Sequence, residues 1–530
     1  MESVAKEQMT TARREDRIHS ANPSRSRIFW PWIAALTALA AGLRTIGLNT
    51  GLWWDEIFFV VESVRRPFAQ VLTVFQGDNQ HPLYTVLAWL SVLAFGEHTW
   101  SFRLPALIFG VASVPLLYLV GASVASRTEA FLAAAFLAVS YHHVWFSQNA
   151  RGYSTLAFWA LAATYFLLRG ISTGKRGPWI AYAAAAALGI YTHVTMVFLV
   201  ASHILICAGM IFSDWRKGSS TVSGIGRWRF PSQAFLLAGW LTLLFYAHIL
   251  VQVQNFFLHR PSSMKAVSTP RWAMWEAVRV LIVGLGTQWV LLGAGVVIVC
   301  GAWSYFRQSR FVFALFALPV VLTALGAFAA RGTMYPRFYF FLIGFAVLIL
   351  VRGIVVIPQW IAARFPIDKG RGGSRSWLAS ALTTILVAIL FVASAMSLAA
   401  NYRYPKQDYE GAIRFVDQER KNEIVVTAGA AGYPLRQYYA KPWESVETGQ
   451  RLREICSQGQ PVWIVYTMPR YLPGSSPGVM EMIRKEFTVI QVFRGTLGDG
   501  DVYVAGFYPP GLTRHQASSN SSAKQIDDRL

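Results

Sequence analysis

Two adjacent acids, Asp55 and Glu56, lie in an unusual setting in the stretch GLNTGLWWDEIFFV at residues 47–60. A tryptophan pair precedes them and large apolar residues follow, although acids in loops are commonly flanked by polar groups. Apolar surroundings reduce the hydration of a carboxylate, so we expect the pKa of at least one of the two to be raised. Such a carboxylate can accept a proton from a hydroxyl group that reaches it. The alternative is that the acids only offset the dipole at the start of an interfacial helix.

Basic side chains that could hold an anion accompany these acids. The arginines that we expect at outer helix ends are Arg151, Arg260, Arg331 and Arg337. A planar guanidinium group suits phosphate because it donates two parallel hydrogen bonds, although such arginines also snorkel or interact with helix C-termini. His81 is a further candidate for a phosphate contact. A divalent metal site would need His81, His193 or His259 to meet carboxylates; spacing does not support this, and the question of a metal cofactor stays open.

The elements that must position these residues are membrane helices. The chain has 530 residues, of which 54% are hydrophobic and 14% charged, and its mean hydropathy is +0.38. A soluble chain carries about 25% charged residues, and many uncharged runs here are long enough to cross a bilayer. The net charge of +21 then belongs to cytoplasmic loops and does not indicate nucleic-acid binding. The three cysteines, Cys207, Cys300 and Cys456, provide neither a disulfide framework nor a zinc spacing.

The apolar runs predict about eleven transmembrane helices, each near the length that a bilayer needs. We expect them at residues 29–47, 104–125, 129–147, 153–169, 178–192, 194–212, 233–252, 288–306, 311–330, 338–357 and 377–399. With residues 1–28 in the cytoplasm, Lys and Arg are enriched in the inner segments, as the positive-inside rule requires. The first run has no cleavage site of small residues, which predicts a retained helix and a multi-pass protein of the inner membrane.

The run HPLYTVLAWLSVLAFG at residues 81–96 is apolar but short. If it crossed the membrane, every later loop would change side, and the basic loops would face outward. We therefore expect an interfacial helix here, in the first outer loop.

The composition changes after residue 400, where the helical membrane domain of residues 29–400 ends. The segments EIVVTAG, PVWIVYT, FTVIQVFRG and DVYVAGFYP read as strands, and EGAIRFVDQERKN and PLRQYYA read as helices. We predict a small extracytoplasmic α/β domain at residues 401–512 and a disordered tail at residues 513–530.

The predicted threading brings polar residues from separate outer loops to one surface, among Trp and Tyr that suit the interface. The residues from which we expect substrate contacts are Trp54, Gln148, Tyr153, His193 and Tyr335. Each of them alone could be a solvated helix end. No glycine loop of the nucleotide-binding type appears, because GAGVV at residues 293–297 lies in an apolar run without a following Lys. An activated lipid-linked donor therefore suits this surface better than a nucleotide.

At these residues the sequence resembles the GT-C superfamily of membrane glycosyltransferases, and more narrowly the protein O-mannosyltransferases and the lipid A aminoarabinose transferases. WWDEIFF is similar to their acidic signature, and HPLYTVLAWL to their HPPL-type motif, with Leu83 where a second Pro is common. WFSQNARGYSTLAFWALAATYFLLR is similar to the S-Q-x-A-R-x-Y stretch of the bacterial branch, and YPRFYFFLIGFAVLIL to a late Arg-Tyr helix. The similarity covers roughly residues 30–400.

The resemblance implies a GT-C fold, a polyprenyl- or dolichyl-phosphate-sugar donor, an acceptor on the outer side and inversion at the anomeric carbon. By this resemblance Asp55 matches the acid that takes a proton from the acceptor hydroxyl, and Glu56 supports the site. His81 matches a position near the donor phosphate, while Arg151 and Arg337 are candidates for binding that phosphate.

Arg260 completes the set of candidates for the donor phosphate. Some relatives carry a second acid near the position of Tyr153, and its absence here argues against a metal-assisted variant. The acceptor is a glycan, a lipid or a protein, and neither it nor the sugar is defined by these residues.

Two other functions fit a polytopic membrane protein. A transporter or lipid flippase commonly has charged or broken helices near the membrane midplane and paired repeats, whereas most ionisable residues here lie at the ends of the predicted spans. A structural protein of polymer assembly would need no base and would tolerate Asp55→Asn.

Overall fold

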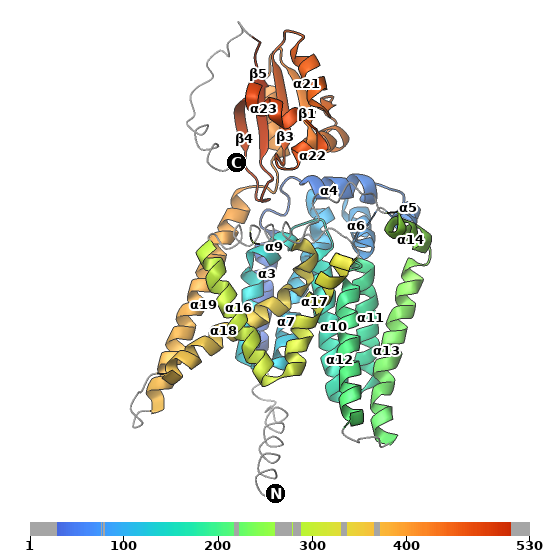
Figure 1. The fold of residues 1–530 in the computed structure, drawn as a ribbon, viewed down its shortest axis with the longest axis vertical. Helices are drawn as coiled ribbons and strands as arrows, with labels where there is room; N and C mark the ends of the chain where they lie inside the picture. Colours follow the sequence, from blue (N-terminus) through green and yellow to red (C-terminus); the bar gives the residue numbers. More distant parts are fainter. Residues whose placement is uncertain are drawn as a thin grey trace.

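The fold is described from a computed structural model, which describes residues 29–75, 77, 80–216, 222–259, 278, 288–329, 336–364 and 372–509. A bundle of long helices forms one end of the molecule and a small mixed α/β domain forms the other (Figure 1). Several short helices lie between these two parts, and they include the residues that surround Asp55.

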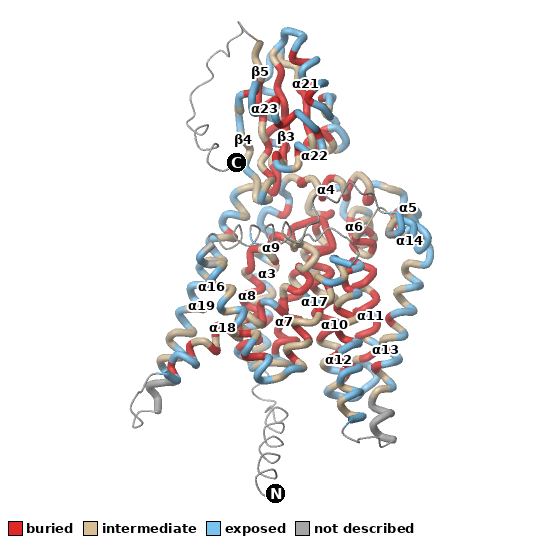
Figure 2. Tube along the Cα trace, in the orientation of Figure 1, coloured by how far each residue is buried: buried red, intermediate tan, exposed pale blue. Residues whose placement is uncertain are grey.

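The helical bundle is built from apolar segments. Its helices are α3 (Phe29–Thr45), α7 (Thr99–Val124), α8 (Arg127–Val139), α9 (Tyr141–Ser147), α10 (Tyr153–Thr173), α11 (Arg176–Thr192), α12 (Met196–Arg216), α13 (Val222–Tyr246), α14 (Leu250–Leu258), α16 (Gln288–Gln308), α17 (Arg310–Ala329), α18 (Ile343–Arg364) and α19 (Gly372–Arg403). Large apolar residues such as Leu236 and Trp240 of α13 and Ile389 of α19 are exposed. Figure 2 shows that many residues of the outer helices are exposed. Such apolar surfaces are stable in contact with lipid and not with water.

Small residues allow the bundle helices to approach closely, as is common in membranes. Alanines of α8, α10 and α11 are fully buried in the central core. Helices α16 and α18 cross at Gly301 and Gly353, where an added Cβ would collide with the backbone carbonyls of Ile349 and Val297 respectively. This crossing fixes α18 beside α16, and the short helix that carries Arg337 leads directly into α18.

Within the described residues, five helices are long and apolar enough to cross a membrane, or up to seven if each of two bent pairs is one span. The chain is therefore a multi-pass membrane protein, and the predicted number of about eleven spans is not confirmed. Two predicted single helices are broken. Residues 129–147 bend by 57° between α8 and α9, and residues 233–252 bend by 89° between α13 and α14.

The bend between α8 and α9 has a local cause in Arg44, which is fully buried at the end of α3. Its guanidinium donates to the carbonyl oxygens of Ala138 at 3.0 Å and Leu137 at 3.3 Å, and lies 2.7 Å from Nδ1 of His143. The guanidinium thus inserts at the end of α8, and a side chain inserted at such a point interrupts the helix ladder.

The loop between α3 and α7 contains α4 (Trp54–Phe59), the π-helical turn η1 (Val60–Val64), α5 (Phe68–Thr73) and α6 (Pro82–Phe95). Helix α6 has 14 residues, which is about 21 Å at 1.5 Å per residue and shorter than the ~30 Å hydrocarbon layer. Its length agrees with the interfacial helix expected at residues 81–96. Gly96 ends it with φ +82°, a conformation that favours glycine.

The C-terminal domain contains a five-stranded sheet of order β2-β1-β3-β5-β4. Strands β1 (Ile424–Ala428), β2 (Glu444–Val446) and β3 (Val462–Thr467) are parallel, and β5 (Val502–Phe507) pairs antiparallel with both β3 and β4 (Thr488–Phe493). Helix α20 (Tyr409–Glu419) packs on one face, and α21 (Gly449–Cys456) and α23 (Val479–Glu486) pack on the other. Four strands lie in the segments predicted as strands, whereas β2, α21, α22 (Leu472–Ser475) and α23 were not predicted.

One hydrophobic core joins the C-terminal domain to the loop between α3 and α7. On the loop side it contains Leu52, Ile57 and Phe59, and on the domain side it contains α20 and Trp463 of β3. The two parts therefore pack as one continuous body and are not separated by an open linker.

Candidate active site

Helix α4 directs its two acids to different partners, because consecutive helical residues point about 100° apart. Asp55 faces the segment that begins α18, and Glu56 faces the interior beneath α4. The side chain of Asp55 is 10% exposed and that of Glu56 is fully buried. The two acids therefore lie in separate environments, although they are neighbours in sequence.

Glu56 is enclosed in an ion pair with Arg103 of α7. Arg103 donates from Nε to Oε1 at 2.7 Å and from Nη2 to Oε2 at 2.6 Å, and both side chains have no exposed surface. The backbone N–H of Ala150 donates to the same carboxylate at 2.6 Å. Arg103 also donates to the carbonyl oxygens of Leu48 and Thr50 at 2.8 Å, which fixes the chain before α4.

Glu56 is not the acid with a raised pKa, although apolar surroundings were expected to raise the pKa of at least one of the two acids. Burial acts in that direction, but Arg103, the ammonium of Lys406 and the N–H of Ala150 outweigh it and hold the pKa of Glu56 below its usual range. Glu56 is therefore a carboxylate at neutral pH, and its oxygens are already occupied. It supports the loop and is not positioned to accept a proton from a substrate.

Asp55 forms an ion pair with Arg337, a residue of the short 3-10 segment η3 (Pro336–Leu342) that precedes α18. Nη1 of Arg337 lies 2.8 Å from Oδ2 of Asp55. Counted over the whole residue, backbone included, Asp55 is 7% exposed, so little of it is in contact with water. The structure thus brings together a first-loop acid and a late arginine that the sequence had marked as separate candidates.

A cluster of rings and cations surrounds His81, which lies immediately before α6. Its ring centroid is 4.9 Å from that of His193 and 4.8 Å from that of Tyr153. Gly152 permits this approach, because a Cβ at that position would lie 2.8 Å from Nδ1 of His81. Both ring nitrogens of His81 are buried, and within the described residues neither makes a hydrogen bond of good geometry. The backbone of Thr192 is close enough to the ring to favour its protonated form, but this effect is smaller than the others.

The electrostatics of this cluster favour an anion. Burial, followed by repulsion from Arg151, His193 and Arg337, lowers the pKa of His81 well below its usual value. His81 is therefore neutral at physiological pH and can offer an N–H without adding charge. Arg151 is itself buried, with 5% of its surface exposed. Two guanidinium groups near a neutral histidine can receive a phosphate group by charge-assisted hydrogen bonds.

The other candidates from the sequence lie in different environments. Trp54 lies beside Asp55, and its ring stacks on Phe58 at 5.5 Å. The amide of Gln148 is occupied inside the protein, since it donates to the carbonyl oxygens of Arg44 and Ile46 and accepts from Asn401. Its expected role as a substrate contact gains no support from this geometry. Arg260, Arg331 and Tyr335 lie outside the described residues.

Three residues that support α4 were not selected from the sequence. Arg103 could have been found, because a charge at the start of a long apolar run commonly has a buried partner. Lys406 and Gln407 gave no such signal, since they follow the last apolar run in a polar segment. Burial, followed by repulsion from Arg103, lowers the pKa of Lys406 to about 7, although Glu56 opposes the shift.

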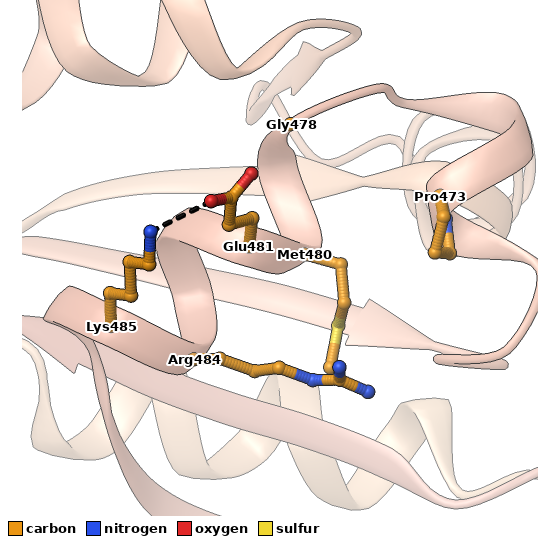
Figure 3. Close-up of a pocket in the computed structure, with 6 residues that line it drawn as sticks. All are labelled: Pro473, Gly478, Met480, Glu481, Arg484 and Lys485. Carbon is orange, nitrogen blue, oxygen red and sulfur yellow. Dashed lines mark hydrogen bonds and ion pairs between the residues drawn. The ribbon is translucent and has the colours of Figure 1, made fainter.

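Among the described residues, no group of three or more His, Cys, Asp or Glu side chains could hold a metal ion. A cavity of about 320 Å³ lies elsewhere, in the C-terminal domain, and is lined by residues of the loop before α23 and of α23 itself. Figure 3 shows the side chain of Arg484 extending toward that of Met480, while Lys485 pairs with Glu481. This cavity contains none of the candidate site residues.

The part of the chain that holds the His81 cluster is similar to a known protein family. Residues 79–225, which include His81, Arg151 and His193, match the family model described as dolichyl-phosphate-mannose-protein mannosyltransferase. The resemblance recognised in the sequence is thereby confirmed.

Individual proteins show the same similarity. YkcB of Bacillus subtilis (strain 168), which is named provisionally as a mannosyltransferase, is 28% identical over 128 residues, which is 24% of this chain and 18% of YkcB. The apo structure of ArnT from Cupriavidus metallidurans has a TM-score of 0.51 and 14% identity, and the match covers 90% of this chain and 98% of ArnT. ArnT bound to undecaprenyl phosphate has the same TM-score at 16% identity, with the same coverage of both chains.

Proposed function

We propose that the chain is a glycosyltransferase that moves a sugar from a polyprenyl-phosphate-linked donor to an acceptor on the outer face of the membrane. The observation that carries the proposal is the contact between Asp55 and Arg337 at 2.8 Å, beside the cluster of His81, Arg151 and His193. A base and an anion-binding group lie together there, as a transfer from a phosphate leaving group requires.

The proposed reaction is a single nucleophilic displacement at the anomeric carbon of the donor sugar. The acceptor hydroxyl oxygen forms a bond to the anomeric carbon while the bond from that carbon to the phosphate oxygen breaks. The electron pair of the broken bond remains on the lipid phosphate, and the hydroxyl proton goes to the carboxylate of Asp55. Because the acceptor attacks from the face opposite the leaving group, the anomeric configuration inverts.

Arg337 has two roles in this proposal. In the present structure it neutralises Asp55, and a donor phosphate would compete with the carboxylate for the same guanidinium. Donor binding would then draw Arg337 toward the phosphate and free the Asp55 carboxylate to accept the proton of the acceptor hydroxyl. Arg151 and neutral His81 would add hydrogen bonds to the phosphate oxygens as negative charge grows on them.

The proposal also covers the orientation of the chain. The N-terminal segment would be cytoplasmic, and Asp55 and the C-terminal domain would be on the outer side of the inner membrane. A phosphate at headgroup level, with its polyprenyl chain in hydrocarbon, then meets α4 at the membrane boundary. ArnT, which shares the fold, has been solved with undecaprenyl phosphate, and this supports a lipid-phosphate donor. The acceptor class stays open among a glycan, a lipid and a protein.

Asp55→Asn tests the proposal directly. Membranes containing either protein are supplied with radiolabelled polyprenyl-phosphate sugars, and transfer to endogenous acceptors is measured. We expect a loss of about 10²- to 10⁴-fold, the usual contribution of a general base. Full residual transfer by Asp55→Asn would remove Asp55 from the mechanism. A wild-type protein that consumes no lipid-linked sugar would refute the transferase function itself.

A further inference from the structure

The helix that carries Asp55 caps its own N-terminus only in part, through Glu56, which accepts from the backbone N–H of Trp53 at 3.3 Å. Trp53 occupies the position before α4, and an indole side chain has no acceptor for the free N–H groups of the first turn. The backbone N–H of Trp54 donates instead to Oε1 of Gln407 at 2.8 Å, across 353 residues of sequence. The residue next to Asp55 is thus held by a side chain from the start of the C-terminal domain.

Gln407 is itself held rigidly by the sheet. Its Nε2 donates to Oγ1 of Thr467 at 3.1 Å, and this hydroxyl donates to the carbonyl oxygen of Asp501 at 2.9 Å. Gln407 is 1% exposed and Thr467 has no exposed surface. Thr467 is the last residue of β3 and pairs with β5. The sheet therefore fixes the position of Gln407 Oε1, which accepts the hydrogen bond from α4.

The segment before α20 is fixed on its other side as well. Nζ of Lys406 donates to the carbonyl oxygen of Gln148 and lies 5.4 Å from the ring centroid of Trp145. The loop between β4 and β5 wraps this segment, since the N–H of Thr496 donates to the carbonyl oxygen of Pro405 at 2.8 Å. Residues 405–407 therefore form a fixed connection between the sheet and the loop around Asp55.

We propose that Gln407 is a positioning residue for Asp55, and that the C-terminal domain thereby forms part of the transferase site. The inference rests on the proposed function of Asp55. Without Gln407, the backbone N–H of Trp54 loses its acceptor, one residue before Asp55. The first turn of α4 is then less firmly held, and the carboxylate of Asp55 no longer keeps a single alignment toward Arg337. An acceptor hydroxyl would then meet a misplaced base, whereas the donor phosphate would keep His81, Arg151 and Arg337.

Gln407→Met tests this inference in the full-length protein, because methionine keeps the length of the side chain and removes both hydrogen bonds. The matched control is Gln491→Met, which makes the same change at an exposed position of β4. We expect kcat of Gln407→Met to fall about tenfold with the donor KM within about twofold of wild type. Gln491→Met should keep wild-type values of both constants.

Two further measurements separate positioning from a general loss of folding. Amide exchange should quicken about fivefold in peptides covering α4 and stay unchanged in α10, as expected for the loss of one hydrogen bond. Thr467→Val should lower kcat less than Gln407→Met does, and the double variant should match Gln407→Met, because Thr467 acts through Gln407.

The outcomes are distinguishable from those of the proposed function. Equal kcat in Gln407→Met and Gln491→Met, or unchanged exchange in α4, would overturn the positioning role even when Asp55→Asn is inactive. If the wild-type protein transfers no sugar, the role of Asp55 fails, and with it this inference as a statement about catalysis. Faster exchange confined to α4, together with a kcat-specific loss, supports it.

Discussion

Replacing Arg103 by methionine would leave the carboxylate of Glu56 buried without its ion-pair partner. Arg103 makes both of its side-chain contacts to Glu56 below 2.8 Å and also binds the carbonyl oxygens of Leu48 and Thr50. Methionine fills a similar volume but donates no hydrogen bond. The change therefore removes the charge that stabilises Glu56 and frees the chain that leads into α4.

The expected cost follows from the burial of both partners. Neither side chain of the pair has exposed surface, and removing one partner of a buried pair commonly costs about 3–5 kcal/mol. The exposed pair of Arg414 and Glu410 offers a matched control, with 3.9 Å between its atoms and side chains that are 65% and 52% exposed. Arg414→Met should change the free energy of unfolding by less than about 1 kcal/mol.

The dependence on pH should reverse in the variant. In the wild-type protein the pKa of Glu56 is lowered, so its contribution is present above the unfolded pKa and is lost as pH falls through the folded value. In Arg103→Met, burial dominates and we expect the pKa of Glu56 to rise above its usual value. The folded variant then binds the proton more tightly than the unfolded chain, and its stability falls as pH rises through the raised pKa.

Unfolding by denaturing detergent, followed at several pH values, measures both effects. Glu56→Gln combined with Arg103→Met should recover part of the loss, because no buried charge then remains unpaired. An Arg103→Met protein within about 1 kcal/mol of wild type at neutral pH, with the wild-type pH slope, would refute the reasoning.

Two further predictions concern the donor site and the helix crossing. Arg337→Ala should raise the donor KM about tenfold or more, with a smaller effect on the acceptor KM, because a charge-assisted contact to phosphate is lost; steady-state transfer assays measure this, and an unchanged donor affinity would contradict it. Gly353→Ala should cost about 1–3 kcal/mol in detergent unfolding, since its Cβ would collide with the backbone of α16. Gly295→Ala on α16 is the control, because its Cβ would meet nothing within 4 Å, and equal losses in both variants would contradict a crossing-specific effect.

Local pattern predicted much of the secondary structure. The strands of the C-terminal domain follow runs such as PVWIVYT, whose alternate residues pack on opposite faces of the sheet. The apolar runs likewise mark most of the bundle helices. The predicted helix at residues 129–147 is broken because a guanidinium from α3 binds the carbonyls of Leu137 and Ala138. That contact joins residues more than 90 positions apart, which an apolar run does not reveal.

The site could be predicted only in its components. Asp55, His81, Arg151 and Arg337 were selected by residue type and position, and the structure brings Asp55 to Arg337 and His81 to His193. We expected a raised pKa for at least one of the two acids, and Glu56 shows the opposite shift, because flanking apolar residues do not reveal a cation 47 positions away.

The single core that joins residues near 50 to residues near 500 sets the order in which the protein can mature. A nascent chain leaves the ribosome from its N-terminus, so the loop after the first helix is made long before the strands that bury it. Until Val502 and Val504 are synthesised, Leu52 and Ile57 lack part of their apolar surroundings. A chain whose translation stops early would therefore lack part of the apolar surface on which α4 packs.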